Sequence, residues 1–259
     1  MPYANLGATR LFYMEDGPAD APVLVLSNSL GTSAAMWAPQ LPVLCEHFRV
    51  IRYDTRGHGK SAIPEGEYTF TQLADDLVGL LDYLEIERAH FCGLSMGGAT
   101  GMQFALAHPQ RLNKLVLCNT AARIGSADGW LARVAAVGES GLDALAPGLV
   151  ERWLTAEFRE REPVQTRQLV DMLRRTSDAG YSANCAALRD ADFRGMVGKI
   201  TAPTMVIAGQ YDLAATVLQG RELAAAISGA RFVELAAAHL SNWEQAGAFN
   251  EALVDFLAG

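Results

Sequence analysis

The chain has 259 residues, of which 50% are hydrophobic and 19% are charged, a composition that supports a large buried core and excludes a disordered protein. Its formal net charge of −8 leaves no basic face for phosphates, so we expect no nucleic-acid partner. The sequence contains no apolar run of the ~18 residues that a membrane span needs, and its N-terminal stretch lacks the pattern of a signal peptide, so we expect no membrane association.

Strand-like apolar runs and helix-like patterns alternate through the first half of the chain. We predict strands at residues 9–14, 23–27, 48–53, 89–92 and 114–118, and helices at 71–84 and 96–107. Two further strands are predicted at 202–209 and 231–235, followed by a closing helix at 246–257. Strands that alternate with helices indicate an α/β fold with a mostly parallel central sheet, flanked by helices on both faces.

Residues 121–196 carry helical patterns without a strand signal, and this stretch is far longer than an ordinary loop. We therefore predict a helical cap at 121–196, inserted between two strands of a core that comprises residues 1–120 and 197–259. Ten of the 21 basic residues lie in this range, and all ten are arginines.

The cysteines and acidic residues show no spacing typical of a metal site or a redox motif. Cys45, Cys92, Cys118 and Cys185 are scattered, and Cys92 and Cys118 lie in apolar strands, where we expect small core residues. This usage favours a reduced, cytoplasmic compartment. No Gly-x-Gly-x-x-Gly follows the first strand, so we expect neither a metal nor a cofactor.

A G-x-S-x-G motif occupies Gly93–Gly97, between a short apolar strand and a helix-forming run. Such a strand-to-helix turn is sharp, and its glycines are needed because a Cβ would clash there. Ser95 would lie at the helix N-terminus, where free N–H groups favour developing negative charge. We therefore predict that Ser95 is a nucleophile, which needs a base to take its proton.

His239 is the preferred candidate for this base. It follows the last predicted strand, at the same carboxyl edge of the sheet as Ser95, and precedes a helix for which Ser241 and Glu244 predict a capping box. His58, in the loop "DTRGHGKS", is the rival at that edge. The other three histidines lie in helix or strand contexts, where a structural role is the default.

Asp212 is the candidate for the third group, which orients the imidazole and stabilises its charged form. It follows the strand "TMVIAG", so Ser95, Asp212 and His239 appear in the order typical of α/β-hydrolases. Asp54 also follows a strand, but its position near Arg56 favours a local ion pair or turn hydrogen bonds.

The whole chain resembles the α/β-hydrolases, and among them the 3-oxoadipate enol-lactonases of bacterial aromatic catabolism. The motifs that carry this resemblance are "LSNSLGTS" (26–33), "YDTRGHGKS" (53–61), "GLSMGGATG" (93–101), "HPQRLNKLVLCNTAARIG" (108–125) and "AAHLSNWEQ" (237–245). The Asn-Ser-Leu-Gly-Thr loop and the Asn-Thr-Ala-Ala start of the cap are the narrower signatures, because the others occur across the superfamily.

The resemblance implies hydrolysis of 3-oxoadipate enol-lactone to 3-oxoadipate, through an acyl-enzyme on Ser95. The backbone N–H groups of Leu30 and Met96 would then form the oxyanion hole. Ser29 occupies a position where related hydrolases carry glycine, so we expect its hydroxyl to contact the lactone or to stiffen the loop.

The implied substrate is a small lactone that carries a carboxylate, whereas the protein is acidic overall. A local cation must therefore hold the substrate, and the arginine-rich cap is the expected source. Trp130 and Arg133 lie three residues apart on one predicted helix face, and Trp153 is a third candidate wall of the pocket.

Three other hydrolase functions remain open on the same scaffold: a general carboxylesterase, a cofactor-free haloperoxidase-like enzyme and a carbon–carbon bond hydrolase. A remote alternative is a ligand receptor that keeps the triad without turnover. The sequence does not indicate an oligomeric state.

Overall fold

An eight-stranded sheet forms the centre of the molecule, a computed structural model that describes residues 3–259. Its strand order is β1-β2-β4-β3-β5-β6-β7-β8. The strands are β1 (Tyr3–Asn5), β2 (Arg10–Asp16), β3 (Val23–Ser27), β4 (Arg49–Tyr53), β5 (Ala89–Leu94), β6 (Leu112–Cys118), β7 (Thr204–Gly209) and β8 (Arg231–Leu235). β2 pairs antiparallel with β1 and β4, and every other pairing is parallel. The predicted mostly parallel sheet is confirmed.

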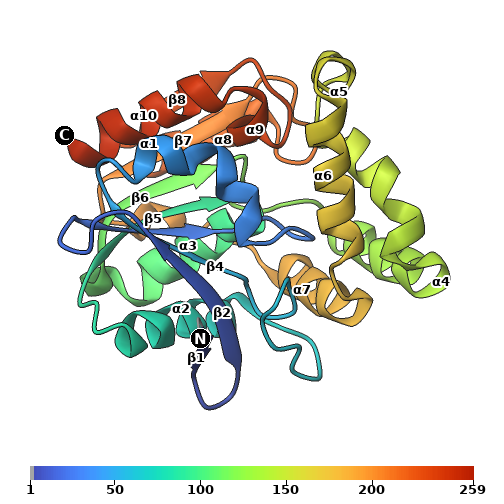
Figure 1. Cartoon of the computed structure of the whole chain (residues 1–259), viewed down its shortest axis with the longest axis horizontal. Coiled ribbons are helices and arrows are strands. Elements are labelled where there is room, and N and C mark those ends of the chain that lie inside the picture. The colour runs from blue at the N-terminus through green and yellow to red at the C-terminus, as the bar shows by residue number, and fades with distance from the viewer. Residues whose placement is uncertain (1–2) are drawn as a thin grey trace.

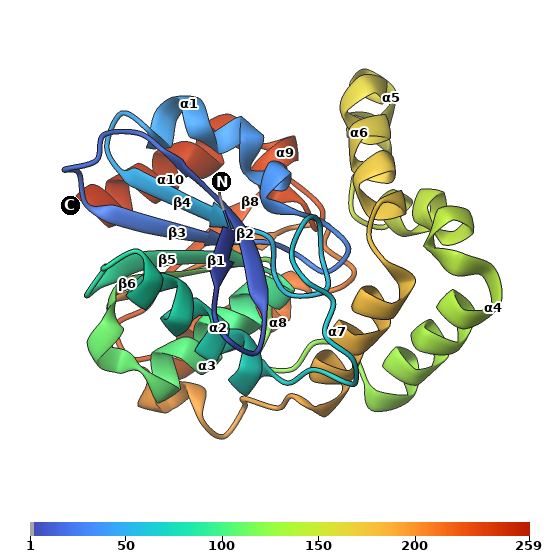
Figure 2. The same cartoon turned by 60° about the horizontal axis from the view of Figure 1, so that its bottom comes forward.

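Helices cover both faces of this sheet (Figure 1). One face carries α1 (Leu41–Leu44), α9 (Ser241–Glu244) and α10 (Ala246–Ala258), and the other carries α2 (Phe70–Tyr83), α3 (Met96–Ala107) and α8 (Val217–Ala226) (Figure 2). Short 3₁₀ helices are η1 (Ala34–Gln40), η2 (Pro109–Arg111) and η3 (Val197–Lys199). The predicted helix at 96–107 is confirmed to the residue, whereas β1 and α8 were not predicted.

The core lies between the sheet and these helices. Each residue of β5 is buried, as is each residue of β7, because strands covered on both faces have no polar side. On α2, Leu73, Leu77 and Leu80 are spaced at helical intervals and are buried against the sheet. Cys92 and Cys118 are buried core residues, as predicted.

Four further helices follow β6 and precede β7 in the chain: α4 (Ala127–Glu151), α5 (Ala156–Arg161), α6 (Pro163–Arg174) and α7 (Asp178–Asp190). They gather beyond one end of the sheet (Figure 2), and we call them the cap helices. Gly141, with φ of 71°, divides α4 into two arms. The division into a core and a cap at 121–196 stays a prediction, and these helices lie within that range. None of the helices described in residues 3–259 combines the length and the hydropathy that a membrane-spanning segment requires.

One close backbone contact attaches the cap helices to the core. Gly57, with φ of +79°, and Gly180 on α7 approach so closely that a Cβ on Gly57 would lie 2.9 Å from the Gly180 Cα. Asn184, one turn further along α7, donates a hydrogen bond of 2.9 Å to the Arg56 carbonyl. These contacts fix the position of α7 over the loop that follows β4.

Candidate active site

Ser95 lies at the turn between β5 and α3, in a strained backbone conformation with φ of 57° and ψ of −113°. The turn is held from β6, because Ser95 N–H donates to the Cys118 carbonyl (2.8 Å) and the Thr120 hydroxyl donates to the Ser95 carbonyl (2.9 Å). The Ser95 side chain is therefore presented at the carboxyl end of the sheet.

The glycines beside Ser95 are required by close packing. A Cβ on Gly97 would lie 2.7 Å from the Ser27 carbonyl carbon, and one on Gly98 would lie 2.7 Å from the Thr120 side chain. A Cβ on Gly93 would meet the backbone of Gly97 and Gly98. The turn is thus built only when these positions lack side chains, as the motif predicts.

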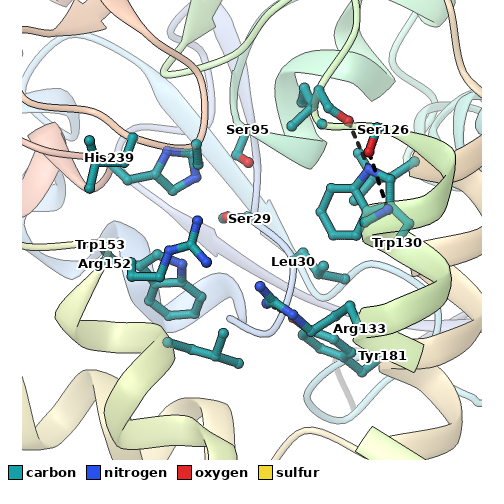
Figure 3. Close-up of a pocket in the computed structure, with 17 residues that line it drawn as sticks. Ser29, Leu30, Ser95, Ser126, Trp130, Arg133, Arg152, Trp153, Tyr181 and His239 are labelled. Carbon is teal, nitrogen blue, oxygen red and sulfur yellow. Dashed lines mark hydrogen bonds between the residues drawn. The ribbon is translucent and has the colours of Figure 1, made fainter. Parts of the chain in front are cut away.

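Asp212 and His239 form a buried pair beside Ser95. His239 Nδ1 lies 2.8 Å from Asp212 Oδ2, which leaves Nε2 as the ring nitrogen that faces Ser95 (Figure 3). The other carboxylate oxygen, Oδ1, accepts hydrogen bonds from the backbone N–H groups of Ala214 (2.8 Å) and Ala215 (3.1 Å). Burial disfavours the carboxylate, but His239 and these donors outweigh it and hold the pKa of Asp212 below its ordinary value.

The loop after β3 is held rigidly from within. The Ser29 carbonyl accepts three hydrogen bonds, from Asn28 Nδ2 (2.9 Å), Thr32 N–H (3.1 Å) and the Thr32 hydroxyl (2.8 Å). In a trans peptide the N–H points opposite to the C=O, so these bonds direct the Leu30 N–H away from the loop. Asn28 Oδ1 in turn accepts from Thr55 N–H (3.1 Å) and the Thr55 hydroxyl (2.8 Å). The orientation of the Leu30 N–H is therefore fixed before a ligand binds.

His58, the rival base, faces this loop instead of Ser95. Its Nε2 accepts a hydrogen bond of 2.9 Å from Gly31 N–H, and Asn184 packs against its other ring nitrogen. Burial lowers the pKa of His58 to about 4, so the ring is neutral at pH 7 and accepts this bond. Its position gives His58 a role in holding the loop.

A cavity of about 280 Å³ joins the core loops to the cap helices. The sequence-predicted residues that line it are Ser29, Leu30, Ser95, Trp130, Arg133, Trp153 and His239. Met96 and Asp212 lie behind this surface and are buried. Figure 3 shows Ser95, Ser29 and His239 facing the side chains from the cap helices across the cavity.

The cap helices place two arginines at this cavity. Arg133, from the first arm of α4, donates a hydrogen bond of 3.1 Å to the Tyr181 hydroxyl, and Arg152 follows the second arm (Figure 3). In residues 3–259 neither guanidinium forms an ion pair with a carboxylate. Burial raises the pKa of Tyr181 to about 12, so its hydroxyl keeps a proton that it can donate. The site therefore offers cations and a donor opposite Ser95.

Sequence reasoning missed Arg152 and Tyr181. Arg152 had a local signal, because Arg152-Trp153 repeats the pairing of an arginine with a tryptophan seen at Trp130 and Arg133. Tyr181 had none, since only the packing of α7 against α4 brings it to the cavity.

One local prediction is wrong. Ser241 and Glu244 form no capping box: the Ser241 hydroxyl donates to Asn119 Oδ1, and Glu244 accepts from Ala238 N–H (2.7 Å) and the Thr155 hydroxyl (2.5 Å). Ser241 bonds to the segment after β6, and Glu244 bonds to Thr155 and to the loop just before α9, so neither side chain caps the helix.

The predicted turn role of Asp54 is confirmed through hydrogen bonds, and not through an ion pair with Arg56. Arg56 makes a two-bond ion pair with Asp76 of α2, with both distances 2.6 Å. The Asp54 carboxylate accepts from Ala34 N–H (2.7 Å) and Lys60 N–H (2.8 Å), so its turn role is served by backbone donors. Residues 3–259 contain no group of three His, Cys, Asp or Glu side chains that could hold a metal ion.

The model of the alpha/beta hydrolase fold family matches residues 22–246 of this chain. The chain is 44% identical over 243 residues to 3-oxoadipate enol-lactonase 2 of Acinetobacter baylyi, covering 94% of this chain and 91% of that protein. It is 38% identical to enol-lactonase 1 of the same organism, covering 93% and 91%. The crystal structure of the enol-lactonase from Burkholderia xenovorans LB400 superposes with a TM-score of 0.98 at 52% identity, covering all of both chains. The resemblance inferred from the motifs is confirmed.

Proposed function

Because the chain belongs to the α/β-hydrolase family, and the alignments with its enol-lactonase relatives cover more than nine-tenths of it, we propose that it hydrolyses 3-oxoadipate enol-lactone to 3-oxoadipate in aromatic catabolism. The observation that carries the proposal is the cavity in which Ser95 and His239 face Arg133. A serine nucleophile on one side and a cation on the other suit a small lactone with a carboxylate.

Acylation begins when His239 Nε2 takes the proton of Ser95 Oγ as this oxygen attacks the lactone carbonyl carbon. The resulting oxyanion accepts hydrogen bonds from the backbone N–H groups of Leu30 and Met96, as its charge develops. Asp212 stabilises the imidazolium that forms. Collapse of the intermediate breaks the acyl carbon–oxygen bond of the ring.

The leaving group of this reaction is an enolate that stays attached to the acyl chain. It takes a proton from His239 and becomes a ketone, which removes the nucleophile that could close the ring again. A water molecule then gives a proton to His239 and attacks the acyl carbon. Ser95 Oγ then leaves the acyl carbon and takes the proton back from His239. The product is released with a free carboxylic acid.

Arg133 is the proposed partner of the substrate carboxylate. Its guanidinium is half-buried and bonded to the neutral Tyr181 hydroxyl, and no carboxylate within residues 3–259 pairs with its charge. Arg152 is exposed beside the same cavity and would add to the attraction of an anion. A charge-assisted hydrogen bond contributes ~1.5–3 kcal/mol, or about tenfold to hundredfold in binding.

The test of this contact is the substitution Arg133→Gln, with Arg167→Gln as the matched control on an exposed arginine of α6. We expect Arg133→Gln to raise KM for a carboxylate-bearing lactone by about tenfold or more, with little change for a neutral ester. An unchanged KM for the lactone would show that the carboxylate lies elsewhere.

A substrate panel tests the function itself. It compares the enol-lactone with p-nitrophenyl esters and with a carbon–carbon bond substrate, at one enzyme concentration. We expect the highest kcat/KM for the enol-lactone. Equal turnover of the simple esters would favour a general carboxylesterase, and binding of the lactone without turnover would favour a receptor.

A further inference from the structure

Asn119 follows β6 at the start of the Asn-Thr-Ala-Ala segment, which the proposed mechanism does not use. It is fully buried and has a positive φ of 46°, a conformation that asparagine tolerates better than most residues. Its neighbours Cys118 and Thr120 are the two residues that hold the backbone of Ser95. The segment thus lies between the nucleophile and the acid loop.

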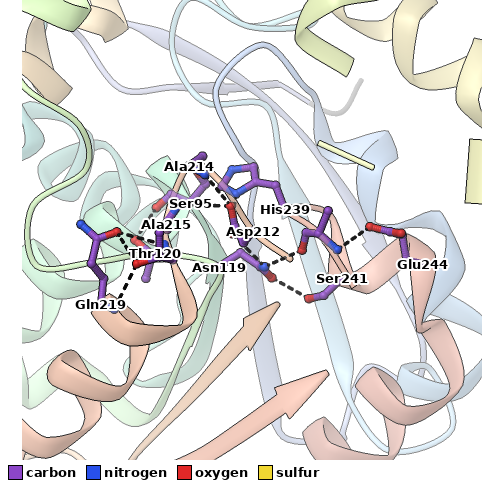
Figure 4. A network of polar contacts seen from close by, with 12 residues as sticks. Ser95, Asn119, Thr120, Asp212, Ala214, Ala215, Gln219, His239, Ser241 and Glu244 are labelled. Carbon is purple, nitrogen blue, oxygen red and sulfur yellow. Dashed lines mark hydrogen bonds and ion pairs between the residues drawn. The ribbon is translucent and has the colours of Figure 1, made fainter. Parts of the chain in front are cut away.

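The side-chain amide of Asn119 bonds to three groups of the candidate triad region (Figure 4). Its nitrogen donates to Asp212 Oδ2 (3.1 Å) and to the Ala238 carbonyl (3.0 Å), so both amide hydrogens are used. Its oxygen accepts from the Ser241 hydroxyl (2.5 Å). Because each polar atom has a partner, the amide has one favourable orientation.

This amide completes the hydrogen bonds of Asp212. Oδ1 already accepts from two backbone N–H groups, and Oδ2 accepts from His239 and Asn119. Each carboxylate oxygen offers about two acceptor directions, so all four are filled. The carboxylate therefore cannot rotate away from His239 without losing bonds. The bond to the Ala238 carbonyl also holds the residue that directly precedes His239.

We propose that Asn119 is a positioning residue for both the acid and the base of the triad. This inference rests on the proposed roles of Asp212 and His239. Asn119 does not line the cavity, so it acts through these two residues and not on the substrate. Its removal should lower kcat and leave KM unchanged.

The experiment uses Asn119→Gly, because glycine adopts a positive φ without strain and removes only the amide. Two rates are measured: turnover of an ester that the wild type accepts, and labelling of Ser95 by a fluorophosphonate, followed by mass spectrometry. We expect kcat and the labelling rate to fall about tenfold to hundredfold, the range for a catalytic group displaced by up to an ångström.

A double-mutant cycle separates positioning from general support of the fold. In an Asp212→Asn background the carboxylate that Asn119 serves is absent and only the bond to the Ala238 carbonyl remains to be lost, so Asn119→Gly should slow labelling by a smaller factor than it does in the wild-type background. Asn250→Ala is the matched control, since Asn250 is a buried asparagine on α10 whose side chain, within residues 3–259, bonds only to the Pro39 carbonyl (3.2 Å). It should lower the melting temperature without changing kcat.

Three results would overturn the inference: a wild-type kcat in Asn119→Gly, a raised KM in place of a lowered kcat, or the same loss of rate in the Asp212→Asn background. If Asn119→Gly does not fold, Asn119→Ser retains the polar character, and the same cycle is measured with it. A wild-type protein whose Ser95 is not labelled would instead refute the proposed function, so the two failures are distinct.

Discussion

The substitution Asp212→Asn changes one atom of the buried pair, and the structure dictates how the new amide orients. With its oxygen in the Oδ1 position, the amide keeps the bonds from Ala214 and Ala215 N–H, and only the Asn119 donor loses its acceptor. The opposite orientation leaves both backbone N–H groups unpaired. An unpaired buried donor costs ~1–3 kcal/mol, so the first orientation is favoured by about that amount.

In this orientation the amide NH₂ faces His239 Nδ1, which must then accept a hydrogen bond. The imidazole proton moves to Nε2, and a protonated Nε2 cannot take the proton of Ser95. The wrong tautomer and the lost negative charge together lower kcat by about 10⁴-fold in a serine hydrolase. KM should change little, because Asp212 does not line the cavity.

The assay is steady-state turnover of the best substrate of the panel, combined with thermal unfolding to show that the variant is folded. Asp54→Asn is the matched control, since Asp54 is also a buried carboxylate at the end of a strand, but within residues 3–259 this carboxylate accepts hydrogen bonds only from backbone N–H groups. We expect it to keep kcat within a small factor of wild type. An Asp212→Asn enzyme within tenfold of wild-type kcat would refute the assignment of the acid.

Three further predictions concern stability and specificity. Between pH 6.5 and about 4, His58 binds a proton in the unfolded chain but not in the folded protein, so stability falls as the pH falls through this window. Between pH 7 and pH 5, the unfolding free energy measured in urea should therefore fall by about 2 kcal/mol less in His58→Gln than in the wild type. Equal losses in the two proteins would contradict the buried neutral ring. Gly97→Ala places a Cβ against the Ser27 carbonyl and should destabilise the fold by ~1–3 kcal/mol in the same assay, whereas Gly247→Ala, where a Cβ meets open space, should not. Ser29→Gly removes a hydroxyl at the cavity and should alter the preference among lactones; an unchanged panel would show that this serine does not contribute to specificity.

The sheet and the candidate triad could be predicted because their signals are local. Ser95 directly follows β5, whereas Asp212 and His239 lie in the loops that follow β7 and β8, and parallel strands bring their carboxyl ends to one edge. The ion pair of Arg56 with Asp76 could not be predicted in this way, since it depends on how α2 packs beside the loop after β4.

The same limit applies to the cavity. Trp130 and Arg133 share a helix face, so their joint position follows from helical spacing. Tyr181 reaches the cavity through the packing of two cap helices, and Ser241 bonds to Asn119, 122 positions away, instead of capping its own helix. Long-range contacts of this kind have no signature in a single sequence.

The central claim is that Ser95 opens the lactone by forming an acyl-enzyme, and rapid-quench mass spectrometry tests it most directly. Because the leaving oxygen stays tethered to the acyl chain, the adduct has the mass of the intact substrate. We predict this increment on the peptide that carries Ser95, formed at a rate no slower than kcat, and its loss together with turnover in Ser95→Ala. Wild-type turnover in Ser95→Ala, or an adduct on another residue, would contradict the account.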